Sequence, residues 1–253
     1  MHKNLTKEKI RAGQTVYGVF CEIYSPVTVE LLGLTGFDFV VIDAEHTPLD
    51  VETCGHMVRA ADNVRVTPII RVAVNVHQNI LRYLDIGALG VQLPMINTKL
   101  DAETVVQAAK YPPEGKRGLG GVRANDYGVT VAMGEYIQQA NRETLVVTQL
   151  ESKEAIHNID EILAVEGIDV FFIGPMDLSC SMGYPGQMSH PEVQATIEHL
   201  VKKIREAGKV AGTWVGVEDL KRAKELGFQY ITHSVHVLLV KAAQKYLEQA
   251  RTA

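Results

Sequence analysis

Polar side chains that could take part in catalysis follow directly on four of the apolar runs in this 253-residue sequence. They are Asp43, Glu45 and His46 after FVVI, Arg71 after PII, Gln149 and Glu151 after VVT, and Asp177 after FFIGPM. A single carboxylate after such a run is usually a helix cap or a surface ion pair, the role we assign to Asp50 and Asp101. The same placement after four separate runs predicts one shared site.

The carboxylates Glu151 and Asp177 are suited to an oxygen-ligand site for Mg²⁺ or Mn²⁺, with Co²⁺ and Zn²⁺ as alternatives. Such a site keeps positions open for water and substrate, and no trio of histidines accompanies it. A 2-oxo acid could chelate the ion through its carboxylate and keto oxygens, and the cation would then stabilise an enolate. The pair therefore predicts enolate chemistry.

Arg71 and His46 supply the other two functions that such chemistry needs. The planar guanidinium of Arg71 can donate to an oxyanion. His46 is suited to proton transfer because the ordinary pKa of imidazole lies near neutrality, and a carboxylate partner can orient the ring. Asp43 and Asp85 are the candidate partners.

The stretch Gly174-Pro175-Met176-Asp177 is a tight turn after an apolar run, and its backbone could bind a substrate carboxylate. Proline has no N–H group, so the available donors are the amides of Met176 and Asp177.

These residues need a scaffold that brings the ends of several strands together. Eight compact apolar runs predict strands at Val16–Glu22, Phe37–Asp43, Thr67–Val72, Leu89–Pro94, Leu145–Glu151, Val170–Gly174, Val210–Trp214 and Phe228–Thr232. Amphipathic segments predict helices at Asp50–Asp62, Asp101–Lys110, Lys153–Ala164, Pro191–Ala207, Val217–Leu226 and Val237–Gln249. This alternation favours a single α/β domain over residues 1–253, a (β/α)8 TIM barrel with an extra C-terminal helix. Such barrels carry their chemistry at the carboxyl ends of the strands.

The segment Tyr111–Gly128 is too long and glycine-rich for a simple connection. Long structured loops are often functional, so we expect a mobile loop near the site.

Composition restricts the possible partners. A formal net charge of −5 gives no basic field for nucleic acid or an anionic membrane, and no apolar run is long enough to span a bilayer. The N-terminal stretch lacks the apolar core of a signal peptide, so a soluble, cytoplasmic protein is expected. Cys21, Cys54 and Cys180 are scattered, which argues against disulfides and a zinc ribbon.

Three other readings of the sequence are weaker. A Schiff-base aldolase needs a buried lysine at a strand end, and Lys153 is better explained as a surface residue at a helix start. The stretch Gly118-Leu119-Gly120-Gly121 matches neither the Walker pattern nor a dinucleotide-binding turn, and it is interpreted as a hinge or lid. His233 and His236 lie near the end of the eighth strand, where packing or exposure is the favoured explanation.

The sequence resembles the HpcH/HpaI aldolases, a family of class II, metal-dependent pyruvate aldolases. The resemblance covers nearly the whole chain. It rests on the stretches GFDFVVIDAEHTP, PIIRV, YLDIGALGVQLPMI, YPPEGKRGLG, TQLESKEAIHNIDEILAVEGIDVFFIGPMDLSCSMGYPG and HPEVQATIEHLVKKIREAGK. The order DAEH, QLE, IGPMDLS is more specific than any one of these motifs.

The resemblance implies a role for each site residue. His46 corresponds to the proton acceptor, Asp85 to the residue that raises its basicity across a subunit contact, and Arg71 to the transition-state stabiliser. Asp43 would support the histidine, and Glu151 and Asp177 would bind the metal. Gln149, Gly174 and the Met176 backbone match positions that contact substrate. The resemblance also implies cleavage of a 4-hydroxy-2-oxo acid to pyruvate and an aldehyde, in a trimer of dimers whose terminal helix packs on a neighbouring subunit.

The sequence departs from the family pattern in three places. Met176 stands where alanine is common, and Ser234 and His236 replace the glycine and aspartate usual near the eighth strand. The third place is the stretch GVRANDYG in the long loop, which matches no known preference for an aldehyde acceptor. Two alternatives stay open at this point: a lyase for acyl-CoA thioesters of the citrate or malyl-CoA type, and an inactive barrel that serves as a binding subunit.

Overall fold

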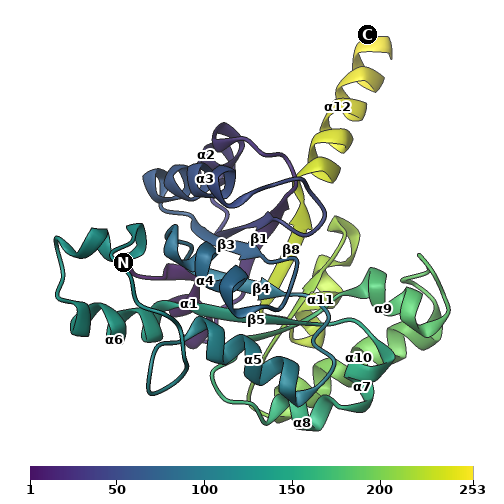
Figure 1. Ribbon diagram of the computed structural model, residues 1–253. Helices are drawn as coiled ribbons and strands as arrows, with labels where there is room; N and C mark the ends of the chain where they lie inside the picture. The colour runs from purple at the N-terminus through teal and green to yellow at the C-terminus, as the bar shows by residue number, and fades with distance from the viewer. Residues whose placement is uncertain (253) are drawn as a thin grey trace.

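Eight parallel strands close into a barrel in which each strand pairs with the next and β8 pairs with β1 (Figure 1). The computed structural model describes residues 1–252. The strands are β1 (Val16–Cys21), β2 (Phe39–Asp43), β3 (Thr67–Arg71), β4 (Gly90–Leu93), β5 (Leu145–Leu150), β6 (Val170–Ile173), β7 (Val210–Trp214) and β8 (Tyr230–Ser234). The predicted TIM barrel is confirmed, and every predicted strand boundary lies within two residues of the observed one.

Helices surround the barrel in the order that the alternating pattern predicts. They are α1 (Leu5–Arg11), α2 (Pro26–Leu34), α3 (Val51–Val64), α4 (His77–Asp85), α5 (Lys99–Ala109), α6 (Met133–Glu143), α7 (Lys153–His157), α8 (Ile159–Leu163), α9 (Pro175–Met182), α10 (Pro191–Glu206), α11 (Leu220–Leu226) and α12 (Val235–Thr252). The 3-10 turns η1 (Arg123–Gly128) and η2 (Val217–Asp219) complete the set. The helix predicted over 153–164 is divided at Asn158, whose side chain donates to the carbonyl of Asn97.

Both carboxylates assigned to capping have that role. Asp50 is the N-cap of α3 and accepts a hydrogen bond from the Thr53 amide at 2.8 Å. Asp101 forms a reciprocal capping box with Thr98 at the start of α5.

An aromatic layer fills the interior of the barrel. The rings of Phe39 and Tyr230 stack with centroids 4.2 Å apart, and Phe172 meets Tyr230 edge-on. A Cβ atom at Gly18 would lie 2.0 Å from the Phe39 ring, and one at Gly212 would lie 2.9 Å from the Tyr230 ring. These strand glycines therefore provide the space that the two rings occupy.

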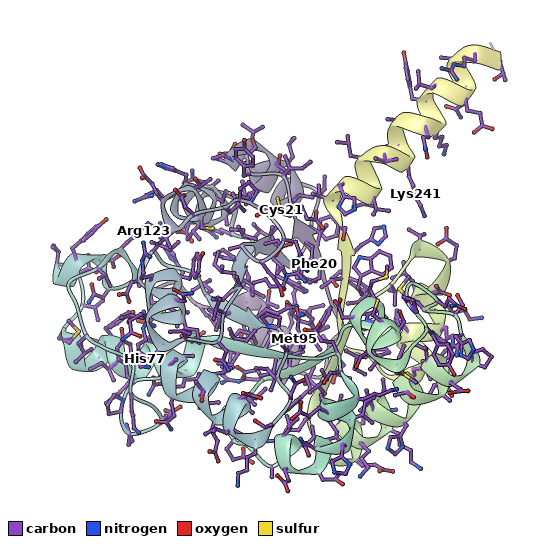
Figure 2. All side chains as sticks on the ribbon, turned by 45° about the vertical axis from the view of Figure 1, so that its right-hand side comes forward. Phe20, Cys21, His77, Met95, Arg123 and Lys241 are labelled. Atoms are coloured by element: carbon purple, nitrogen blue, oxygen red, sulfur yellow. The ribbon has the colours of Figure 1, made fainter. Side chains whose placement is uncertain are left out.

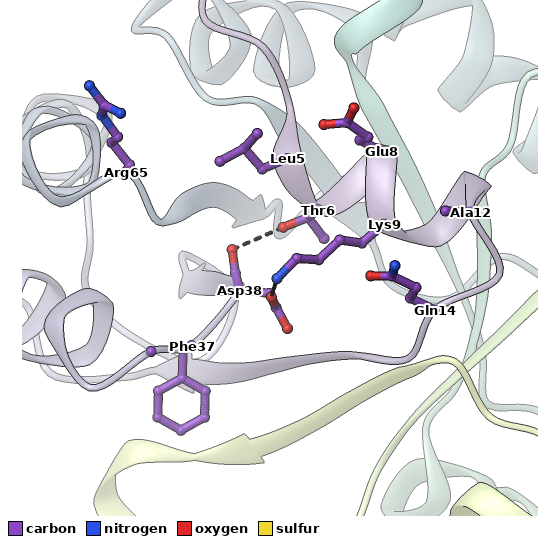
Figure 3. A pocket seen from close by; sticks show the side chains of 10 residues that line it. Leu5, Thr6, Glu8, Lys9, Ala12, Gln14, Phe37, Asp38 and Arg65 are labelled. Carbon is purple, nitrogen blue, oxygen red and sulfur yellow. Dashed lines mark hydrogen bonds and ion pairs between the residues drawn. The ribbon is translucent and has the colours of Figure 1, made fainter.

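Helix α1 packs against the residues that precede several strands, and Figure 3 shows its Thr6 and Lys9 side chains pointing toward Asp38. The hydroxyl of Thr6 donates to the carbonyl of Asp38 at 2.9 Å, Lys7 donates to the carbonyl of Thr144 at 2.6 Å, and Ile10 packs with the interior cluster. A hollow of about 440 Å³ lies beside this helix, and two of the charged groups that line it, Lys9 and Asp38, pair with each other. Since those two charges satisfy each other, we assign the hollow no role.

The segment 111–128 lies at the amino-terminal face, so the expectation that it forms a loop near the site is wrong for a single chain. Arg117 pairs with Asp85 at the end of α4, and Arg123 pairs with Asp62 near the end of α3. Figure 2 shows Arg123 on the opposite side of the molecule from Lys241, which belongs to the helix that follows β8. The physical reason is connectivity: the segment follows a helix, α5, and connections from a helix to the next strand lie at this end of a barrel.

Helix α12 projects from the barrel, as Figure 1 shows at the yellow end of the chain. It extends the predicted C-terminal helix by two residues at its start and three at its end. Val235 is its one buried residue, and its apolar side chains include the exposed Leu239, Val240, Tyr246 and Leu247. In the part of the chain that the structure describes, no helix is both long and apolar enough to cross a membrane.

Candidate active site

The polar residues predicted to form a site point into the barrel because they share the alternation of the buried interior residues. Val41, Ile69 and Val147 belong to the interior cluster, and Asp43, Arg71 and Gln149 each follow one of them by two positions. Strands β2 and β3 pair with Asp43 opposite Arg71. The structure therefore brings these side chains to the carboxyl end of the barrel, as predicted.

Asp43 and Arg71 form a two-pronged ion pair. Nε and Nη2 of Arg71 donate to Oδ1 and Oδ2 of Asp43 at 2.9 and 2.6 Å. Asp43 is fully buried. Burial alone would raise the pKa of Asp43, but the hydrogen bonds and charge of Arg71 hold that pKa below its ordinary value. The carboxylate is therefore ionised, and it fixes the plane of the guanidinium.

The guanidinium of Arg71 has two further neighbours, the ring of Phe20 and the carboxylate of Glu45. Its guanidinium carbon lies 4.5 Å from the centroid of the Phe20 ring, and its Nε lies 3.3 Å from Oε2 of Glu45. A guanidinium has five N–H groups. Two of them are used on Asp43, which leaves three for other acceptors.

Asp43 supports His46 through the backbone rather than through the imidazole. Its Oδ1 accepts hydrogen bonds from the amides of Glu45 and His46 at 3.0 and 3.3 Å. The imidazole Nε2 instead lies 3.8 Å from Oε2 of Glu45, and the His46 side chain is 61% exposed. The Asp43 oxygens are occupied by Arg71 and by these amides, so the support that this candidate partner gives to His46 passes through the backbone.

Glu45 lies between Arg71 and His46, a position that the strand pattern of the sequence does not predict. Its Oε2 atom is buried and has no hydrogen-bond partner. Burial raises the pKa of Glu45 above its ordinary value, as do the charges of Asp43 and Asp177, while the charges of Arg71 and His46 lower it.

Glu151 is a second buried carboxylate at the mouth, with 3% of its surface exposed. Its Oε1 accepts the Met95 amide at 2.7 Å, and its Oε2 accepts Nε2 of Gln149 at 2.8 Å. Burial raises the pKa of Glu151 to about 7, and the charges of Asp177 and Glu45 add to the effect, against the two hydrogen bonds. Met95 has φ 54°, a left-handed conformation that is uncommon outside glycine, and its amide is one of the two groups that bind Glu151.

Asp177 and the backbone of Met176 lie in the first turn of α9, immediately after β6. Leading amides of a helix have no partner within it, so this turn keeps the predicted donors available. Both residues are exposed. Gly174 precedes the turn, and a Cβ atom there would lie 2.6 Å from Oε2 of Glu151. Glycine at this position is therefore what allows Glu151 and α9 to approach each other.

The carboxylates at the mouth fit a divalent cation. The charge of Asp177 raises the pKa of both Glu45 and Glu151, which indicates negative charges that repel one another. A cation would relieve that repulsion. Among the residues that the structure describes, no group of three or more His, Cys, Asp or Glu side chains could hold an ion by itself, so water or substrate would have to complete its coordination. All the available donors are oxygen atoms, the type that Mg²⁺ and Mn²⁺ prefer.

Two of the predicted contacts are differently placed. Asp85 lies at the end of α4, where Oδ1 accepts Nη2 of Arg117 at 2.8 Å, away from the His46 of the same chain. Gln149 is 2% exposed. Its oxygen accepts from Gln92 and its amide group donates to Glu151, so its role as a substrate contact stays a prediction.

Two of the residues that depart from the family pattern, Ser234 and His236, lie at the rim near β7 and β8. Ser234 accepts a hydrogen bond from Nε1 of Trp214 at 3.1 Å. His236 lies 3.2 Å from a carboxylate oxygen of Glu22, and the ring of His233 stacks on Trp214. The rim opposite Asp43 and Glu151 is thus partly aromatic.

Comparison with known proteins agrees with this arrangement. The family described as HpcH/HpaI aldolase/citrate lyase matches residues 16–242. The hydroxypyruvate/pyruvate aldolase of Roseobacter denitrificans is 41% identical over 240 residues, which cover 94% of this chain and 93% of that protein. The 4-hydroxy-2-oxo-heptane-1,7-dioate aldolase of Shigella sonnei is 39% identical over 246 residues, covering 96% and 93%. A crystal structure of an HpcH/HpaI aldolase/citrate lyase family protein from Burkholderia cenocepacia superposes with a TM-score of 0.93 at 30% identity, covering 98% of this chain and 100% of that one.

Proposed function

The chain belongs to the HpcH/HpaI aldolase/citrate lyase family, and from that premise we propose that it cleaves a 4-hydroxy-2-oxo acid reversibly into pyruvate and an aldehyde. The enzyme is a carbon–carbon lyase. The observation that carries the proposal is the meeting of the Asp43–Arg71 pair with the buried Glu151 at one barrel mouth.

His46 governs the proton on the substrate hydroxyl. Its imidazole is exposed at the mouth, where it accepts the C4 hydroxyl proton directly or through a water molecule. The C3–C4 bond then breaks, the aldehyde leaves, and the bonding electrons remain on the pyruvate half. Proton delivery to C3 of that half completes the formation of pyruvate.

Arg71 stabilises the oxygen on which negative charge develops. The two prongs to Asp43 hold its guanidinium in one plane, so its remaining N–H groups are oriented before the substrate binds. The first-turn amides of α9, at Met176 and Asp177, would bind the substrate carboxylate, and Gly174 lets the Glu151 carboxylate lie against the start of this helix.

Glu151 and Asp177 would bind the divalent cation, Mg²⁺ or Mn²⁺. When bound, the cation supplies positive charge that stabilises the enolate form of pyruvate. Glu151 is oriented for this role by the Met95 amide and by Gln149.

The active enzyme would be an oligomer, a trimer of dimers in our proposal. Its support is the apolar surface of α12, where Leu239, Val240, Tyr246 and Leu247 are exposed in a single chain. In that assembly Asp85 would act on the His46 of a neighbouring subunit.

The methyl protons of pyruvate provide a direct test of enolate formation. Purified enzyme with Mn²⁺ or Mg²⁺ in deuterated water should exchange them, followed by proton NMR, and EDTA should stop the exchange. Exchange that continues after complete metal removal would overturn the role of the cation. No exchange under any metal condition would overturn the proposed reaction. If exchange is found, a screen of aldehydes with pyruvate would identify the acceptor.

A further inference from the structure

A line of four buried polar side chains runs through the barrel interior from β8 to the mouth. The Tyr230 hydroxyl donates to Oε1 of Gln92 at 3.1 Å, and Nε2 of Gln92 donates to Oε1 of Gln149 at 2.6 Å. Nε2 of Gln149 then donates to Oε2 of Glu151 at 2.8 Å. None of the four is more than 3% exposed.

The Glu151 carboxylate, at the end of this line, determines which group donates in each of the hydrogen bonds. An ionised carboxylate can only accept hydrogen bonds, so Gln149 has to present its NH2 group to Glu151. The side-chain oxygen of Gln149 then faces Gln92, so Gln92 has to donate a hydrogen bond to it from its own NH2 group. The oxygen of Gln92 is left facing the one remaining group, the phenol of Tyr230, which can donate. Reversal of either amide would place two acceptors against each other.

The far end of the line is rigid. Tyr230 is fully buried, its ring stacks on Phe39 at 4.2 Å, and Phe172 packs against it edge-on at 6.1 Å. Gly212 provides the space for the ring. The phenol oxygen thus has a fixed position, and so does the side-chain oxygen of Gln92 that accepts its hydrogen bond.

We infer that Gln92 and Tyr230 are positioning residues that orient the Gln149 amide and, through it, the Glu151 carboxylate. The inference rests on the proposed function, because it takes Glu151 as a ligand of the cation. Both residues are fully buried, and their side-chain hydrogen bonds connect them to the site through Gln149. Groups that orient a metal ligand from behind typically change the affinity for the metal by about 10–100-fold when removed.

The line also predicts how two substitutions combine. Since the groups act in series, Gln92→Leu disconnects Tyr230 from Gln149. The substitution Tyr230→Phe should therefore add little once Gln92 is replaced. Two residues that merely stabilise the barrel independently would have effects that multiply.

The experiment measures Mn²⁺ affinity by electron paramagnetic resonance, together with the thermal unfolding temperature of each metal-free variant. Wild type is compared with Gln92→Leu, Tyr230→Phe, the double variant and Glu151→Gln. Tyr136→Phe is the matched control, because Tyr136 is also fully buried but its hydroxyl has no hydrogen-bond partner and lies in a separate cluster with Tyr111. We expect about 10-fold weaker binding for Gln92→Leu and for Tyr230→Phe, the same loss in the double variant as in Gln92→Leu, and wild-type affinity in the control.

Two results would overturn the inference while leaving the proposed function intact. In the first, Gln92→Leu and Tyr230→Phe bind Mn²⁺ as wild type does although Glu151→Gln binds weakly, and only their unfolding temperatures fall. In the second, the losses multiply in the double variant. If instead Glu151→Gln binds Mn²⁺ as tightly as wild type, the assignment of Glu151 as a ligand is wrong, and the inference is overturned with it.

Discussion

Arg71 presents Nε and Nη2 to the two oxygens of Asp43 across the neighbouring strands β2 and β3, at 2.9 and 2.6 Å. The same carboxylate accepts the backbone amides of Glu45 and His46. One buried aspartate therefore sets the direction of the arginine and the course of the turn that carries the histidine.

Replacement of Arg71 by lysine should lower kcat by about 100-fold or more. Lysine keeps the charge but is a single-point donor, so it cannot satisfy both Asp43 oxygens and keep a planar group facing the substrate. Steady-state kinetics of the cleavage reaction check this, with Arg142→Lys as control because Arg142 lies on the surface and pairs with Glu143. A loss below threefold for Arg71→Lys would exclude the proposed oxyanion role.

The metal-free enzyme should lose stability as the pH rises from about 4.5 to 7, relative to Glu151→Gln. The pKa of Glu151 is raised from 4.5 to about 7 in the folded state, chiefly by burial. The folded protein therefore holds a proton on this group that the unfolded chain has already released, and the associated stability is lost as the pH rises through the folded pKa. The loss should reach about 3 kcal/mol at most.

Urea denaturation at a series of pH values, in the presence of EDTA, measures this difference. Glutamine mimics the neutral carboxyl group, so the other titrating groups, Asp43 among them, cancel in the comparison. Parallel pH profiles for the two proteins would show that the pKa of Glu151 is not raised.

Gly174→Ala should weaken Mn²⁺ binding by about 10-fold or more. The added Cβ would lie 2.6 Å from Oε2 of Glu151, so the carboxylate or the start of α9 has to move. Gly134→Ala in α6 is the matched control, since no atom lies within 4 Å of its Cβ position. Equal affinity in both variants would mean that Glu151 can shift without cost to the cation site.

Mixed oligomers of His46→Asn and Asp85→Asn subunits should recover activity that neither variant has alone. If the two residues act across a subunit contact, a contact between the two variants contains one intact site. In that site the Asp85→Asn subunit supplies His46 and the His46→Asn subunit supplies Asp85. Co-expression with two different affinity tags, followed by purification through both, isolates the mixed species for assay. Activity no higher than that of the separate variants would place His46 and Asp85 in independent roles.

The strand ends could be predicted because the position of each polar residue in its apolar run determines both its face and its end of the barrel. The placement of Asp43, Arg71 and Glu151 at the barrel mouth could be predicted from this pattern alone. The placement of Glu45 beside the imidazole could not be foreseen, because it depends on the turn that Asp43 holds through backbone amides. Gln92 and Tyr230 were also beyond reach, since they are 138 positions apart and meet only when the barrel closes.

The position of segment 111–128, in contrast, could have been predicted from the sequence. Its length and glycine content suggested a functional loop, but it follows a predicted helix rather than a strand. That order alone assigns it to the amino-terminal face, where Arg117 and Arg123 anchor it to α4 and α3.

Helix α1 gives the barrel a closed base. Asn4, Thr6, Lys7 and Ile10 are all buried there, and their hydrogen bonds reach the starts of several strands. Because an aromatic layer fills the barrel above this base, the mouth at the carboxyl ends of the strands is the one route to the site. In the proposed reaction the oxo acid enters and the aldehyde and pyruvate leave through this mouth, so both products have to depart before the next substrate can bind.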